Sequence, residues 1–139
     1  MNKLVLPNEI LLEEVAGLLA EGREVVFRPK GSSMLPFIRG DRDSVVLRKF
    51  ASVSIGDILL VRLDGRYVLH RLIRREGDVL VLMGDGNLRG TETCTEADVL
   101  GTVVAIEKEN GSRRRPGKGR FWRALKPFRR ILLAIYRRI

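Results

Sequence analysis

Two apolar runs meet at a tight turn in Ile58-Leu59-Leu60-Val61-Arg62-Leu63-Asp64-Gly65-Arg66-Tyr67-Val68-Leu69-His70-Arg71-Leu72-Ile73. Asp64-Gly65 is typical of a two-residue hairpin loop, because both of its residues tolerate the positive φ that such a loop needs. The loop pairs Leu63 with Arg66, and continuing the register sets His70 opposite Leu59. Side chains alternate along a strand, so the hairpin predicts which residues share a face with His70.

On the second strand, Val68, His70 and Leu72 are expected on one face. The other face is expected to hold Tyr67, Leu69, Arg71 and Ile73. His70 therefore has apolar neighbours, which is more typical of a half-buried histidine than of a catalytic one if the hairpin is considered alone.

Short runs with strong β propensity recur on both sides of this hairpin, with turn residues between them. They are Glu24 to Phe27, Ser44 to Arg48, Asp57 to Leu63, Arg66 to Arg75, Asp78 to Met83 and Val99 to Ile106. This spacing predicts a mainly β fold, a small antiparallel sheet or barrel with its β core over residues 24–106.

One helix is predicted before the β region, over residues 8–21. Asn8 can cap it and Gly22 follows its end. An apolar stripe of Leu11, Val15, Leu18 and Leu19 indicates that it packs on the sheet.

The excess of positive over negative charge comes from the C-terminal segment. Residues 1–112 carry 15 Lys/Arg and 17 Asp/Glu, whereas residues 113–139 carry 11 Lys/Arg and no acid. We therefore expect a β domain over 1–112, followed by a basic linker and an amphipathic helical tail over 113–139. A near-neutral body argues against nucleic acid as its partner, and the tail predicts docking of residues 120–139 on a membrane surface.

In this tail, an apolar stripe is predicted at three- and four-residue steps, with arginines largely opposite. The stripe contains Phe121, Trp122, Leu125, Phe128, Leu132, Ile135 and Ile139, while Leu133 falls on the polar side. Packing of the stripe on the body or on a partner protein is the alternative interpretation.

Composition limits the remaining chemistry. Cys94 and His70 are the single cysteine and the single histidine, so no intrachain disulfide can form and a structural zinc site lacks ligands. We predict no metal and no cofactor. No apolar stretch has the length of a membrane-spanning helix and Met1 to Leu6 is too short for a signal peptide, so a cytoplasmic or peripheral location at the cytoplasmic face is expected.

The candidate nucleophile lies in Gly31-Ser32-Ser33-Met34-Leu35-Pro36, a segment whose glycine and proline favour an irregular turn that can present a hydroxyl to a cleft. His70 and Asp85, within Gly84-Asp85-Gly86-Asn87, complete the residue types of a serine hydrolase triad. Serine is a poor nucleophile without a base, and His70 is the only imidazole present.

The order of these pieces resembles the type I signal peptidase family, within the LexA-like serine peptidase superfamily. The resembling segments cover roughly residues 24–106 and are Gly31 to Pro36, Gly56-Asp57, His70-Arg71, Gly84 to Asn87 and Gly101 to Val104. His70 stands where bacterial members have lysine, as in the archaeal and endoplasmic-reticulum members.

This resemblance implies a serine endopeptidase that processes signal peptides or other precursor proteins. Ser33 would be the nucleophile, His70 the general base and Asp85 the orienting acid, with Asp57 as the alternative acid. Ser32, Met34 and Pro36 would lie at the oxyanion and substrate edge, although Met34 could equally pack in the core. The substrate would be an extended peptide added to a strand edge.

A second hypothesis is a non-enzymatic, repressor-like binding module whose basic tail binds nucleic acid, membrane or an acidic partner. Ala16-Gly17 also resembles the small-residue bond that LexA-like peptidases cut in themselves, but it lies inside the predicted helix.

Overall fold

The computed structural model describes residues 3–5, 9–29, 33–40, 42–87, 90–119 and 128–138. Its strands are β1 (Lys3–Val5), β2 (Val25–Arg28), β3 (Ser44–Arg48), β4 (Ile58–Leu63), β5 (Arg66–Glu76), β6 (Val79–Met83), β7 (Glu92–Cys94), β8 (Val99–Glu107) and β9 (Arg113–Arg114). Its helices are α1 (Glu9–Ala20), the short 3-10 helix η1 (Glu96–Asp98) and α3 (Arg129–Arg138).

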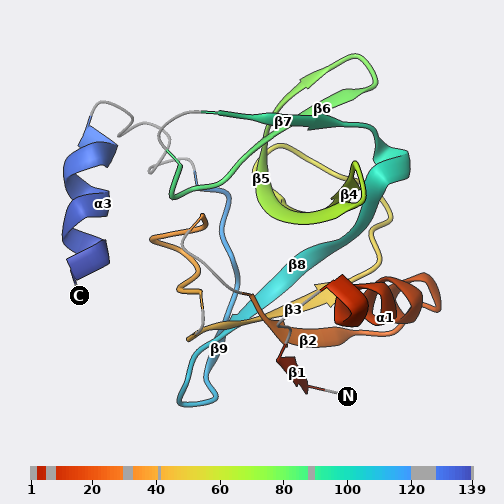
Figure 1. The fold of residues 1–139 in the computed structure, drawn as a ribbon, viewed down its shortest axis with the longest axis horizontal. Coiled ribbons are helices and arrows are strands. Elements are labelled where there is room, and N and C mark those ends of the chain that lie inside the picture. The colour runs from red at the N-terminus through yellow and green to blue at the C-terminus, as the bar shows by residue number, and fades with distance from the viewer. Residues whose placement is uncertain are drawn as a thin grey trace.

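The strands form one strongly curved sheet in the order β1-β2-β3-β8-β4-β5-β6-β7, with β9 paired to β8 (Figure 1). β1 and β2 are parallel, and every other pair is antiparallel. The predicted fold class, mainly β with one N-terminal and one C-terminal helix, is confirmed.

The hairpin prediction holds residue by residue. Leu63 pairs with Arg66 and Leu59 with His70. Asp64 and Gly65 both have positive φ, 48° and 76°, as a two-residue loop of this kind needs. Asp64 is the only non-glycine residue with positive φ in the described part of the chain.

β4 is central because both of its faces are buried. Ile58 and Leu60 face a first core cluster, which α1, β2, β3 and β8 complete: Val15, Leu19, Val25, Phe27, Met34, Ile38, Val45, Leu47, Ile58, Leu60, Val103 and Ile106. Leu59 and Val61 face a second cluster: Val53, Leu59, Val61, Leu72, Leu80, Leu82, Cys94 and Val99. The two clusters explain why the β4 sequence is almost continuously apolar rather than alternating.

The expected faces of β5 follow the same division. Tyr67 and Leu69 pack against the first cluster, whereas Val68 packs against the second and Leu72 belongs to it. The register shifts between Leu72 and Arg74, where β5 and β6 form an irregularity. His70 and Arg71 lie just before this shift, on opposite faces of the strand.

Three strands were not expected from the sequence: β1, β7 and β9. Each has only two or three residues, too few for an alternating pattern to show. α1 agrees with the predicted helix, and Val15 and Leu19 are fully buried on its stripe. Asn8, the predicted cap, lies outside the described residues.

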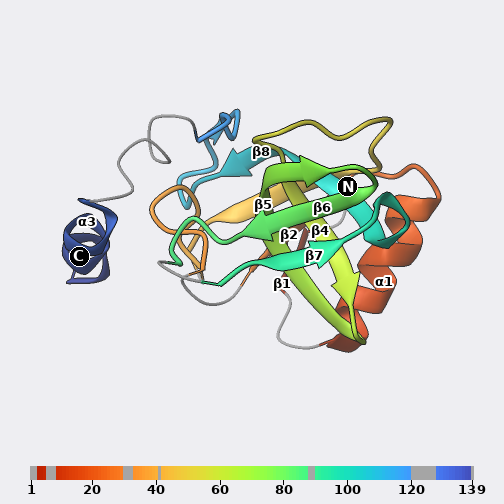
Figure 2. The same cartoon turned by 90° about the horizontal axis from the view of Figure 1, so that it is seen from above.

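The C-terminal segment contacts the β domain before it reaches α3. Arg113 pairs with Glu107, and Arg71 donates a hydrogen bond to the carbonyl oxygen of Gly117. α3 lies at the opposite end of the molecule from α1 (Figures 1 and 2). No helix within the described ranges is long and apolar enough to cross a bilayer.

One expectation for the tail helix was wrong. Leu133, predicted on the polar side, is buried. Phe128 and Ile135 of the predicted stripe are exposed, so the contradicted expectation is the one for Leu133. The reason is tertiary: α3 turns Leu133 toward Leu35 of the body, and this contact outweighs the pattern within the helix. Phe121, Trp122, Leu125 and Ile139 lie outside the described residues.

Candidate active site

Ser33 opens a compact turn, residues 33–38, which we call the nucleophile turn. The carbonyl oxygen of Met34 accepts hydrogen bonds from the backbone N–H groups of Phe37 and Ile38, both at 3.0 Å. Ser33 is half-buried, and the Leu35–Pro36 peptide bond is cis. The turn therefore holds the Ser33 hydroxyl outside regular secondary structure, as predicted from the glycine and proline around it.

A glycine-rich loop after β6, residues 84–86, is bonded to this turn. The N–H of Gly86 donates to the carbonyl oxygen of Ser33 at 2.7 Å. The N–H of Asp85 donates to the sulfur of Met34 at 3.4 Å. Two segments some fifty residues apart in sequence are thus fixed to each other at the candidate nucleophile.

Gly84 shows how closely the site residues approach one another. A Cβ atom placed on Gly84 would collide with the backbone oxygen of Ser33 and would come 2.9 Å from Nε2 of His70 and 2.8 Å from Nδ2 of Asn87. The backbone oxygen of Ser33 and Nε2 of His70 therefore border the same small volume beside Gly84. Only glycine leaves enough room for both.

His70 reaches this volume from β5. Its Nδ1 atom contacts the carboxylate Oε1 of Glu92 on β7, and Nε2 lies on the side of Gly84. A carboxylate at Nδ1 holds the imidazole in the tautomer whose Nε2 can accept a proton. His70 is mostly buried, with 8% of its surface exposed, so neighbouring residues enclose most of its side chain.

Sequence reasoning missed Glu92. It lies in the three-residue strand β7, which carries no apolar alternation and was not predicted. The pairing of Leu82 with Glu92, and of Leu72 with Leu82, places the Glu92 side chain on the face of the sheet that His70 shares. One signal in the sequence could have indicated Glu92. It is a carboxylate that follows a glycine-rich loop within a few residues, where the chain can return beside β6 as another antiparallel strand.

Asp85 occupies a different position from the one expected. Its carboxylate accepts three bonds from the guanidinium of Arg71, at 2.6 to 3.1 Å, and both side chains are buried. The carboxylate at Nδ1 of His70 belongs to Glu92, in the place that the resemblance implied for Asp85. The physical reason is that His70 and Arg71 point to opposite faces of β5, and Asp85 meets the face of Arg71.

Arg71 connects four segments of the site. Besides Asp85, it donates to the carbonyl oxygens of Gly56 and Gly117 at 2.8 and 2.9 Å. Its guanidinium carbon lies 5.0 Å from the centre of the Phe37 ring, within the range of a cation–π contact. Arg71 and Asp85 therefore link the nucleophile turn to β5, to the turn before β4 and to the C-terminal segment.

Asp57, the alternative acid, contacts Ser54 and Lys118. It accepts a hydrogen bond from the N–H of Ser54 at 2.9 Å and forms an ion pair with Lys118. These bonds close the turn before β4 and hold the C-terminal segment on it. In this structure Asp57 therefore stabilises a turn.

The expected oxyanion and substrate edge is only partly described. Pro36 is half-buried on the nucleophile turn, and Ser32 lies outside the described residues. Met34 is buried in the first core cluster, with 4% of its surface exposed. Met34 therefore packs in the core, which agrees with the core-packing interpretation of this residue.

A model of the family described as Peptidase S24-like matches residues 6–104 of the chain. The chain belongs to the Peptidase S24-like family. This match contains Ser33, His70 and Glu92 and covers well over half of the sequence, which confirms the predicted LexA-like serine peptidase superfamily. The family includes serine peptidases and also LexA-type repressors. No curated protein sequence matches the chain.

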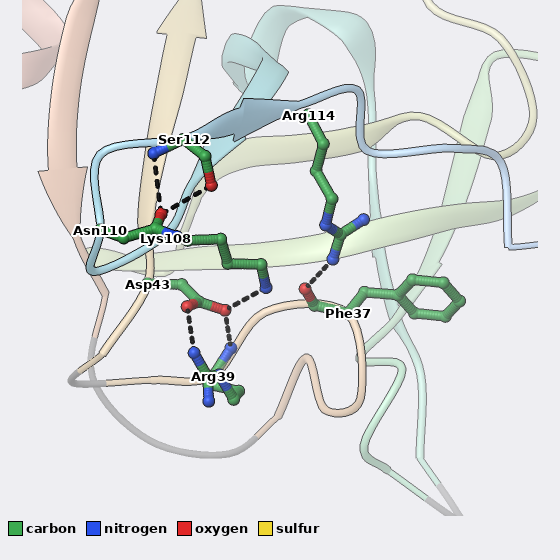
Figure 3. Close-up of polar contacts among 7 residues, drawn as sticks. All are labelled: Phe37, Arg39, Asp43, Lys108, Asn110, Ser112 and Arg114. Carbon is green, nitrogen blue, oxygen red and sulfur yellow. Dashed lines mark hydrogen bonds and ion pairs between the residues drawn. The ribbon is translucent and has the colours of Figure 1, made fainter.

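In this Peptidase S24-like chain, a second polar cluster lies where the nucleophile turn ends, around Phe37 and Arg39 (Figure 3). Asp43 accepts bonds from the N–H and the guanidinium of Arg39, at 2.9 and 3.2 Å, and from Lys108 at 3.0 Å. Arg114 donates to the carbonyl oxygen of Phe37 at 2.7 Å. Burial works to raise the pKa of Asp43, but the bonds from Arg39 and Lys108 outweigh it and hold the pKa below 3.8.

Within the described ranges, no group of three or more His, Cys, Asp or Glu side chains is close enough to bind an ion. Cys94 is buried, and burial followed by the nearby charge of Asp98 raises the pKa of its thiol to about 11. A thiol with such a pKa stays protonated and is a weak nucleophile at neutral pH.

Proposed function

We propose that this protein is a serine endopeptidase of the signal-peptidase type that cleaves an extended peptide or precursor protein. The observation that supports this best is that the backbone oxygen of Ser33 and Nε2 of His70 both lie close to Gly84, with Glu92 on the other nitrogen of the ring. Family membership supplies the general class of serine peptidase. The substrate type is carried over from the sequence resemblance.

In the proposed reaction, His70 accepts the hydroxyl proton as Ser33 attacks the carbonyl carbon of the scissile bond. Glu92 stabilises the imidazolium that forms, and His70 then donates the proton to the leaving amine. Water attacks the resulting ester with His70 again as base, which releases the second product and restores Ser33. Among the described residues, no hydrogen bond joins the Ser33 hydroxyl to His70, and such bonds commonly tighten only when substrate is bound.

The backbone N–H of Ser33 is the proposed oxyanion donor, since a nucleophile on a turn presents its own amide to the developing charge. Signal peptidases often add a hydroxyl two residues before the nucleophile. Here that position is Gly31, which has no hydroxyl. We therefore expect a slower reaction than in family members that have both donors.

An extended substrate has an available strand edge near this site. In the described sheet β7 pairs with β6 on one side and ends the strand order, and it carries Glu92. Backbone pairing along such an edge would hold the peptide extended. The self-cleavage bond Ala16–Gly17, in contrast, lies within α1 between the buried Val15 and Leu19, so its cleavage would require the helix to unwind.

The test is mass spectrometry of a pooled library of signal peptides and small-residue peptides after incubation with the full chain. Cleavage is expected from the native protein and should fall by at least about 10³-fold in Ser33→Ala and in His70→Ala. The matched control is Ser54→Ala, which removes a hydroxyl from the turn before β4 and should retain activity.

Cleavage that persists in Ser33→Ala would remove Ser33 from the mechanism. No cleavage by any folded form, together with no labelling of Ser33 by a fluorophosphonate, would overturn the peptidase proposal and favour a repressor-like binding module.

A further inference from the structure

Helix α3 has one face on the body, and this face meets the nucleophile turn. Leu133 is buried, with 1% of its surface exposed, and packs with Leu35 beside Phe37 and Leu132. Arg129, one helical turn earlier, is also buried. Residues four apart lie on the same face of a helix, so Arg129 and Leu133 define the side that faces the body.

The opposite face of α3 is apolar and open. Phe128, Ile131 and Ile135 have 59%, 64% and 53% of their surface exposed. Phe128 directly precedes α3, and Ile131 and Ile135 lie within it. Steps of three and four residues place these three side chains in one stripe, and at 3.6 residues per turn the stripe lies roughly opposite Arg129 and Leu133. Of the five large hydrophobic side chains exposed in the described chain, three are gathered here.

This apolar stripe sits in the most basic part of the sequence. Residues 113–139 contain 11 Lys/Arg and no acidic residue, and Arg130 is exposed on α3 itself. A partner that fits must therefore cover apolar side chains and at the same time supply negative charge. A bilayer rich in anionic lipid does both, because its acyl region accepts the stripe and its headgroups surround the cations.

We propose that α3 docks this protein on an anionic lipid surface through Phe128, Ile131 and Ile135, while Leu133 keeps the helix seated on the nucleophile turn. The helix then lies in the plane of the interface. Because Leu35 and Leu133 are in contact, the turn that carries Ser33 is held close to the same surface.

Other partners fit less well. A second copy of α3 would bring two segments of like charge together, since neither contains an acid. Nucleic acid would neutralise the arginines but would leave the stripe of Phe128, Ile131 and Ile135 in water. Each of these partners gives a distinct result in the experiment below.

The experiment is co-sedimentation of the full chain with two kinds of vesicle, at low and at high salt. One kind is phosphatidylcholine alone, and the other also contains roughly 30 to 40 mol% phosphatidylglycerol. We expect binding to the anionic vesicles and much weaker binding to the neutral ones. The double variant Ile131→Ser/Ile135→Ser should lower the partition coefficient by about ten-fold or more. Its matched control is Val79→Ser, an exposed apolar residue at the start of β6.

Both isoleucines are exposed, so the double variant should keep the circular dichroism spectrum and melting temperature of the native chain. Binding that the double variant retains in full, or equal binding to both vesicle types, would overturn the proposal. So would self-association without vesicles that the double variant abolishes, or nucleic-acid binding in place of vesicle binding. Ser33→Ala should bind vesicles normally, so the outcome is independent of the peptidase proposal.

Discussion

The guanidinium of Arg71 and the carboxylate of Asp85 form a paired contact in the interior, with Nε 2.8 Å from Oδ1 and Nη2 2.6 Å from Oδ2. Arg71 is fully buried and Asp85 nearly so. This pair links β5 to the loop after β6, and its two residues directly follow His70 and Gly84 in the sequence.

Removing one partner of this pair should be costly. Arg71→Met leaves a buried carboxylate without its guanidinium, and we expect the free energy of unfolding to fall by about 3–5 kcal/mol. Urea denaturation at pH 7 measures this. Arg74→Gln, which breaks the exposed pair with Glu76, is the control and should cost about 0.5 kcal/mol or less. A loss below about 1 kcal/mol in Arg71→Met would show that the pair does not support the fold.

Glu92 should control turnover rather than binding. Glu92→Gln keeps the shape but removes the negative charge at Nδ1 of His70, so kcat for peptide cleavage should fall by about 10²-fold or more while KM changes little. Glu92→Asp should recover part of the rate. Glu96→Gln, on the nearby 3-10 helix, is the control. Equal activity of Glu92→Gln and the native chain would exclude the orienting role.

Gly84 should tolerate no side chain. In Gly84→Ala the new methyl group would displace Ser33 or His70, so we expect loss of cleavage that exceeds the loss of stability. Gly17→Ala in α1 is the matched control, because nothing lies within 4 Å of its added Cβ. The control should gain about 0.5–1 kcal/mol in unfolding free energy with unchanged activity. Normal kinetics in Gly84→Ala would show that the site has more room than the structure indicates.

Asp43 should make stability depend on acid pH. Its pKa in the folded chain is lowered, so its contribution is complete above the unfolded value of 3.8 and is lost as the pH falls through the folded pKa. In Asp43→Asn the free energy of unfolding should therefore fall by about 1–3 kcal/mol at pH 7, but by much less at strongly acidic pH. Chemical denaturation across this range tests the prediction. A loss of unfolding free energy in Asp43→Asn that stays constant down to the lowest pH would contradict the prediction.

Cys94 should be unreactive until the protein unfolds. Burial raises the pKa of its thiol to about 11, so the thiolate that reacts with disulfide reagents is scarce even at pH 8. We expect slow labelling by an aromatic disulfide in buffer and rapid labelling in urea. Fast labelling of the native protein would mean that the second core cluster opens readily around β7.

Much of the scaffold was predictable because its determinants are local. The Asp64-Gly65 loop sets the pairing of β4 with β5 through its own backbone conformation, and alternation then assigns the faces of Val68, His70 and Leu72. The nucleophile turn was recognisable for the same reason, since glycine and proline restrict the backbone within a few residues of Ser33.

The partners of the site side chains were not local. Whether Asp85 or Glu92 meets His70 depends on the pairing of β6 with the short strand β7, and on the opposite faces of His70 and Arg71. No periodicity in the sequence specifies a contact between residues twenty-two positions apart.

The amino-acid sequence by itself determined the hairpin register, the N-terminal helix, the β class and the residues that could serve as nucleophile and base, because turn chemistry and side-chain alternation act over a few residues. Only the tertiary structure decided that Glu92 contacts Nδ1 of His70, that Asp85 binds Arg71, and that Leu133 faces the nucleophile turn. These contacts join distant segments, and the packing of the whole sheet sets which side chains meet.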